Sequence, residues 1–200
     1  MRDRRGLWLR LGAHVGALVP LVVLGLAVWG QRLGPDPIGE SIRRSGRTAL
    51  WLLLLSLMPG AARVVLGLAH LRPLRRILGL YAFLYAILHA GLILGVDYAW
   101  DGAVFVAGLS APFPLAGLAA WLLLLPLGPT STRGWQQRLG PGWPRLHRLV
   151  YPAAALSVVH FIWAAKELRP DRLLYGVVLL LLLLLRLWPV AGRWAGRRAH

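Results

Sequence analysis

The sequence predicts an all-α membrane protein, organised as one bundle of six transmembrane helices over residues 1–200. Hydrophobic residues make up 58% of the chain and charged residues only 15%, and the mean hydropathy is +0.61. A soluble domain of ordinary composition carries about 25% charged residues. The apolar residues also gather in runs, and a helix needs about 20 of them in succession to cross a bilayer.

These apolar runs define the predicted spans in chain order. They cover approximately residues 8–30, 48–69, 76–96, 110–128, 146–165 and 172–190. The first follows the basic stretch MRDRR, but its apolar part is too long for the core of a signal peptide and lacks a small-residue cleavage site, so we expect it to remain as a helix. The third has no charged residue between Arg76 and Asp97.

The later spans differ in the strength of their signal. The fourth is the weakest, because it contains Pro112, Pro114 and Pro126, although all three lie near its ends, where proline costs least. The fifth begins near Leu146. The sixth is the least ambiguous, because it contains the run LLYGVVLLLLLLLRLW.

The distribution of charge predicts the orientation of the bundle. With the N-terminus in the cytoplasm, 16 arginines fall on the cytoplasmic side, against seven lysines and arginines on the opposite side. Six of the seven acidic residues lie on that opposite side. Basic residues are retained in the cytoplasm, so we expect both termini there.

Composition and motifs exclude several other classes of protein. The net charge of +16 could indicate nucleic-acid binding, but the arginines sit between apolar runs and form no continuous basic face, so we expect a lipid environment and no nucleic-acid partner. The absence of cysteine excludes disulfides, thioether-attached haem and iron–sulfur clusters. No H-E-x-x-H, G-x-S-x-G or Walker motif occurs, and the spans contain no carboxylate for a proton relay.

Two histidines are expected at the same depth in the membrane, on different helices. His89 lies ~20 Å along the third span and His160 ~21 Å along the fifth, both counted from the cytoplasmic side at 1.5 Å per residue. Each neutral imidazole offers one nitrogen lone pair, so this pair is suited to be the two axial ligands of a haem iron. The alternative left open is a histidine that only forms hydrogen bonds between helices.

A second group of polar residues is predicted near the cytoplasmic face. His147 lies 13 residues before His160, and the position 13 residues before His89 is Arg76 rather than a fourth histidine. His147 with Arg75 and Arg76 therefore predicts an inner site for an anionic group, such as a flavin phosphate or haem propionates, with weaker axial ligation. The alternative for the arginines is ordinary anchoring at the cytoplasmic face.

The other histidines carry less information. His14 is near the cytoplasmic end of the first span and could reach the inner site. We expect His70, in the basic loop before the third span, and the terminal His200 to be solvated.

Three sequence blocks resemble the MsrQ (YedZ) family of the ferric-reductase-like transmembrane superfamily. They are SGRTAL (45–50), RRILGLYAFLYAILH (75–89) and LHRLVYPAAALSVVHFIW (146–163), supported by the loop TSTRGWQQRLG (130–140). The resemblance covers nearly the whole chain in order. It is carried by the blocks and their separations, since a short motif such as LH alone has no specificity.

The resemblance implies a function as a membrane electron carrier. Family members pass electrons from the quinone pool, or from a cytoplasmic flavin reductase, through haem b and FMN to MsrP, a periplasmic molybdopterin enzyme that reduces methionine sulfoxide in oxidised proteins. The haem-linked histidines of the family correspond to His89, His147 and His160. Larger relatives hold two haems with two histidine pairs, and Arg76 stands where the fourth ligand would fall.

Two rival functions remain open from the sequence. One is a standalone transmembrane ferric or quinone reductase that uses the same haem. The other is a transporter or membrane scaffold without redox chemistry. We do not expect the chain itself to reduce the sulfoxide, because nothing in it resembles a molybdopterin site.

Overall fold

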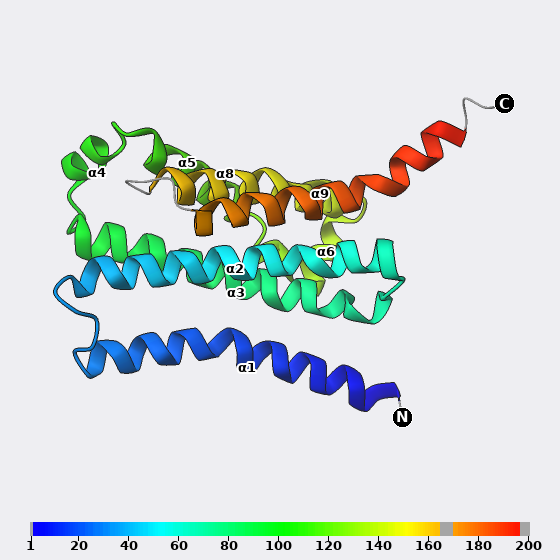
Figure 1. Cartoon of the computed structure of the whole chain (residues 1–200), viewed down its shortest axis with the longest axis horizontal. Coiled ribbons are helices and arrows are strands. Elements are labelled where there is room, and N and C mark those ends of the chain that lie inside the picture. The colour runs from blue at the N-terminus through cyan, green and yellow to red at the C-terminus, as the bar shows by residue number, and fades with distance from the viewer. Residues whose placement is uncertain (1, 165–169, 197–200) are drawn as a thin grey trace.

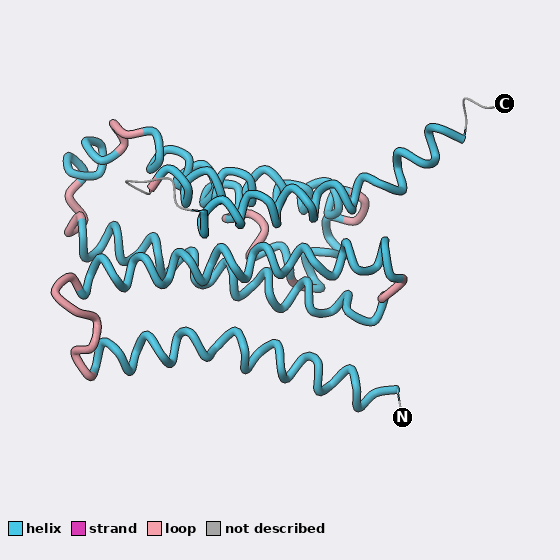
Figure 2. The backbone as a smooth tube through the Cα atoms, viewed as in Figure 1, coloured by secondary structure: helices cyan, strands magenta, loops and turns pink. Residues whose placement is uncertain are grey.

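A computed structural model describes residues 2–164 and 170–196, and within these ranges the chain contains helices, turns and loops but no strand (Figure 2). The helices are α1 (Arg2–Trp29), α2 (Pro37–Leu66), α3 (Arg72–Leu92), α4 (Gly102–Gly108), α5 (Pro112–Leu124), α6 (Arg133–Leu139), α7 (Gly142–Leu146), α8 (Val150–Trp163) and α9 (Pro170–Gly196). A π-helical turn, Ile93–Asp97, extends α3, and a 3₁₀ turn, His147–Leu149, connects α7 to α8. His200 lies outside the described residues.

Each predicted span contains or overlaps one helix of the structure, namely α1, α2, α3, α5, α8 and α9. Among the described residues, four helical segments are long and apolar enough to cross a membrane: Gly6–Trp29, Pro37–Leu66, Ala69–Asp97 and Pro112–Ser131. Helix α8 has only 14 residues, or ~21 Å at 1.5 Å per residue, which is short for a span. Neither α8 nor α9 is among those four segments, so that each crosses the membrane stays a prediction.

Helix α2 begins at Pro37, eleven residues before the predicted start of the second span at residue 48. The Asp36 carboxylate caps the helix by accepting a 2.8 Å hydrogen bond from the Gly39 amide, and Glu40 pairs with Arg44 at 2.7 Å. The Gly39 hydrogen bond, followed by that of Arg43, holds the pKa of Asp36 below its ordinary value. The added turns are polar and held by capping and ion pairs, so a search for apolar runs missed them.

The helices lie in three approximate layers (Figure 1). Helices α2 and α3 form the central pair, α1 contacts the α3 side, and α5, α8 and α9 cover the other side. The buried core contains Leu53 and Leu54 of α2 and Ala153 and Ala154 of α8, whose small side chains allow close packing. In Figure 1 the N-terminal end of α1, the α2–α3 turn, α6 and the C-terminal end of α9 lie at the same end of the bundle.

The described termini therefore share one end of the bundle, as the predicted topology requires. This arrangement does not identify the compartment at that end. A cytoplasmic location for both termini stays a prediction from the distribution of arginines.

The buried serines of α2 satisfy their hydroxyl groups within the helix. Ser45 donates to the Ser41 carbonyl at 2.8 Å, and Ser56 donates to the Leu53 carbonyl at 2.6 Å. Hydrogen bonds of this kind are common where a polar side chain has no other partner in an apolar environment. These hydroxyls already have acceptors, so they are not primary candidates for binding a ligand.

Replacing Tyr85 with phenylalanine should weaken the attachment of α1 to α3. The buried Tyr85 hydroxyl donates a 2.8 Å hydrogen bond to the Ala17 carbonyl, which links the two helices. Its loss should lower the free energy of unfolding by about 0.5–1.5 kcal/mol. Thermal unfolding of the detergent-solubilised protein measures this change, and an unchanged transition would show that the bond adds nothing to the docking of α1.

Candidate cofactor site

His89 lies in the last turn of α3 and is held by α2. Its Nδ1 is 2.9 Å from the Ile42 carbonyl oxygen. A carbonyl only accepts hydrogen bonds, so Nδ1 carries the proton and donates it. The other ring nitrogen, Nε2, then keeps its lone pair, which is the state that a metal-binding histidine requires.

His160 lies in the last turn of α8 and is held in the same way by α5. Its Nδ1 donates to the Phe113 carbonyl at 2.7 Å. This hydrogen bond again leaves Nε2 as the nitrogen with a free lone pair. The two histidines thus have the same tautomer and the same kind of backbone partner, on two separate helix pairs.

The rings of His89 and His160 lie close together in an edge-to-face arrangement. Their centroids are 6.2 Å apart and their planes cross at 71°. Each ring keeps the lone pair of its Nε2, so the two residues are candidates to bind one iron between them.

This donor set fits a haem better than a bare metal ion. No group of three or more His, Asp or Glu residues within the described ranges is placed to hold a metal. Two imidazoles alone leave a metal ion with too few ligands. A porphyrin brings its own four nitrogens and needs only axial ligands from the protein, so the two histidines are sufficient.

A glycine makes room for each of the two rings. A Cβ atom added to Gly46 of α2 would lie 2.8 Å from the His89 ring, and one added to Gly117 of α5 would lie 2.7 Å from the His160 ring. Real Cβ atoms essentially never approach another atom so closely. Any larger residue at either position would therefore displace the ring.

The two glycines occupy equivalent positions relative to the carbonyls that hold the rings. Gly46 follows Ile42 by four residues, and Gly117 follows Phe113 by four residues. A helical side chain leans toward the N-terminus and covers the turn before its own Cα, so a side chain at the fourth position would cover the carbonyl. Both histidines thus reach a helix carbonyl through the space that a glycine leaves open.

His147 lies near the other end of the bundle in a separate polar cluster. Its Nε2 is 3.1 Å from the Thr130 hydroxyl, and the Trp143 ring stacks on it with centroids 4.1 Å apart. The Trp143 Nε1 donates to the Thr130 carbonyl at 2.8 Å. The loop before α8 therefore fixes the orientation of the His147 ring.

The two arginines of the predicted inner site have different surroundings. Arg75 is half-buried, whereas Arg76 is exposed. Of the two, Arg75 is therefore the arginine that the packing shields from solvent.

The remaining predicted positions have ordinary surroundings. His14 is exposed, and its Nδ1 lies 3.1 Å from the Tyr81 hydroxyl of α3. No described contact joins His14 to His147. His70 is exposed, in the 3₁₀ turn Ala69–Leu71 before α3.

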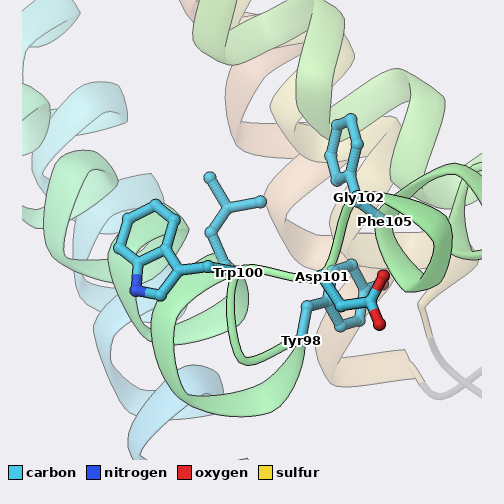
Figure 3. A pocket seen from close by; sticks show the side chains of 6 residues that line it. Tyr98, Trp100, Asp101, Gly102 and Phe105 are labelled. Atoms are coloured by element: carbon cyan, nitrogen blue, oxygen red, sulfur yellow. The ribbon is translucent and has the colours of Figure 1, made fainter.

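A small open cavity lies between the end of α3 and the start of α4 (Figure 3). Leu94, Tyr98, Trp100, Asp101, Gly102 and Phe105 line a volume of about 180 Å³. Pockets for cofactors are larger, at about 300–1,000 Å³. This cavity is therefore distinct from the histidine pair and too small for a porphyrin.

Comparison with known proteins places this geometry in a family. Residues 45–158 match the family model described as "Ferric reductase like transmembrane component", and this range contains Gly46, His89 and Gly117. A protein of Xanthomonas axonopodis pv. citri is 42% identical over 88% of this chain and 84% of its own length. One from Rhodospirillum rubrum is 40% identical over 99% of this chain and 95% of its own length.

Both relatives are named "Protein-methionine-sulfoxide reductase heme-binding subunit MsrQ". The chain belongs to the MsrQ family. The full-length match to the Rhodospirillum rubrum protein includes the segment with His160, which lies just beyond the range of the family model. No solved structure shows significant similarity to the chain.

Sequence analysis missed the residues that hold the two rings. Gly46 lies inside the quoted block SGRTAL, but its contact with His89 depends on the packing of α2 against α3. The acceptors Ile42 and Phe113 act through backbone oxygens, which carry no side-chain signal. A glycine within each predicted helix was the available signal, and a glycine in a helix does not by itself show what packs against it.

Proposed function

We propose that the chain is the haem b subunit of a membrane electron-transfer system, with His89 and His160 as the axial ligands. The observation that carries the proposal is the pair of rings 6.2 Å apart, each with Nδ1 bound to a helix carbonyl. The names of the relatives support haem as the bound group.

The residues of the chain set the conditions for electron transfer. When bound, the haem supplies an iron that is oxidised and reduced by one electron. Ligation by both histidines would occupy the two axial positions and so favour electron transfer over oxygen chemistry. The carbonyls of Ile42 and Phe113 keep both rings in the ligating tautomer, and the surrounding apolar helices limit the access of water.

We further propose that His147, Arg75 and Arg76 form an inner site for FMN or a second haem, where electrons enter. Electrons would come from the quinone pool or a cytoplasmic flavin reductase. They would leave to a periplasmic molybdopterin subunit of the MsrP type, in the bacterial inner membrane. The word "subunit" in the relatives' names supports a partner of this kind, and the half-buried positive charge of Arg75 supports an anionic ligand.

A reduced-minus-oxidised absorption spectrum of the purified protein tests the haem assignment. A b-type α-band with at least one haem per chain is expected. A protein without that band would be a scaffold or transporter, and the proposal would be wrong.

The family model also favours a second function, a standalone transmembrane ferric or quinone reductase. Electron delivery to a molybdoenzyme of the MsrP type distinguishes the two. The dithionite-reduced protein should be reoxidised when the partner and a methionine sulfoxide substrate are both present. Reoxidation by ferric chelate or quinone alone, with no response to the partner, would favour the standalone reductase.

A further inference from the structure

The described part of the chain contains two buried side-chain polar atoms without a hydrogen-bond partner. They are Nε1 of Trp121 on α5 and the hydroxyl of Tyr151 on α8. Unsatisfied buried donors are rare in folded proteins, because each costs the desolvation of a polar group. Each is therefore a candidate for a hydrogen bond to a bound ligand.

The two unsatisfied groups lie at the same depth in the bundle. Trp121 follows Phe113 by eight residues, which is ~12 Å along α5, and Tyr151 precedes His160 by nine residues, which is ~13.5 Å along α8. Phe113 and His160 are in hydrogen-bond contact, so both distances start from one level. Tyr151 also lies four residues, or about one turn, after His147.

Arg186 of α9 brings a positive charge to this depth. Its guanidinium carbon lies 5.1 Å from the centroid of the Tyr151 ring. A Cβ atom added to Gly60 of α2 would lie 2.7 Å from its Nη1, so Gly60 leaves room for the arginine. The side chain is half-buried and packs among α2, α8 and α9, which lie side by side in the bundle (Figure 1).

No acidic side chain in the described ranges neutralises Arg186. Asp36 and Glu40 pair instead with Arg43 and Arg44, around the start of α2. Arg186 follows a run of seven leucines and lies four residues before the predicted end of the sixth span. An arginine that serves only to anchor the helix would extend toward the interface, whereas this one packs over Tyr151.

We infer that Arg186 and Tyr151 bind the anionic oxygens of a cofactor, as a phosphate or a carboxylate, at the level of the inner site. The inference rests on the proposed function, because it assigns further ligand-binding residues to the site of His147 and Arg75. An arginine presents several donors to such a group, and the tyrosine hydroxyl adds one more. Trp121 supplies a further unsatisfied donor at the same depth.

Cofactor content of purified variants tests this inference without measuring activity. In Arg186→Gln, the affinity for the inner cofactor should fall by about tenfold or more, since a charge-assisted hydrogen bond is lost. Tyr151→Phe should produce a smaller fall. Gly60→Ala should lower the affinity for the inner cofactor as Arg186→Gln does, because the added methyl group displaces the Arg186 guanidinium. Arg63→Gln, which removes an exposed arginine of α2 three residues after Gly60, is the matched control.

Two assays distinguish the possible sources of the anionic group. A lower ratio of released FMN to protein identifies a flavin phosphate, and a lower ratio of pyridine haemochrome to protein identifies haem propionates. Equal cofactor content in Arg186→Gln and wild type, or an equal loss in Arg63→Gln, would overturn the inference. The absorption that depends on His89 and His160 should persist in Arg186→Gln, whereas its absence from the wild type would refute the proposed function instead.

Discussion

Replacing either His89 or His160 with alanine should abolish the b-type absorption that depends on this pair. Under the proposed ligation each ring would supply one of the two axial nitrogens. The opposing ring, 6.2 Å away, would already supply the other and so would not replace the one removed. Loss of a metal ligand removes a bond that nothing else in an apolar bundle restores. The measurement is the amplitude of the reduced-minus-oxidised α-band per mole of purified protein.

The controls are histidines with other surroundings. His70→Ala and His14→Ala should keep the band near its wild-type amplitude, because His70 is exposed and His14 contacts Tyr81 rather than the histidine pair. Size-exclusion chromatography of each variant shows whether the bundle is still assembled. Full haem content in both His89→Ala and His160→Ala would refute the assignment of these residues as ligands.

Substituting alanine for Gly46 or Gly117 should lower haem affinity by about tenfold, with a larger effect for valine. The added Cβ would lie 2.8 Å from the His89 ring or 2.7 Å from the His160 ring, so the ring must move from its carbonyl. Overpacking of this kind costs about 1–3 kcal/mol. Titration of cofactor-depleted protein with haemin measures the change in affinity.

A third glycine provides the matched control for this experiment. A Cβ atom at Gly91 of α3 would meet nothing within 4 Å. Gly91→Ala should therefore bind haem as the wild type does, and it should be slightly more stable, since alanine favours a helix over glycine by about 1 kcal/mol. If all three alanine variants bound haem equally well, ring displacement by a Cβ atom would be excluded as a determinant of affinity.

The positions of His89 and His160 along their predicted spans were enough to predict that the two residues lie at the same depth. The depths of ~20 Å and ~21 Å for His89 and His160 required only the helical rise and an approximate start for each span. The close approach of the rings confirms that shared depth. Their role as axial ligands stays a prediction, as does the inner site formed by His147 and the arginines.

Other features were beyond the reach of sequence analysis, for identifiable physical reasons. The start of α2 depends on the Asp36 cap and on polar ion pairs rather than on apolar residues. The short helices α4 and α6 are too brief to show a hydrophobic period. The position of Arg186 over Tyr151 depends on how α9 is rotated against α8, which a run of leucines does not specify.

The attachment of each ring to a neighbouring helix has a mechanical consequence. One imidazole moves with the α2–α3 pair and the other with the α5–α8 pair, because their hydrogen bonds to Ile42 and Phe113 stay within those pairs. An iron bound by both imidazoles would link the α2–α3 pair to the α5–α8 pair. Cofactor binding should then make the whole bundle more rigid. The distance between the two helix pairs would in turn set the affinity for the iron.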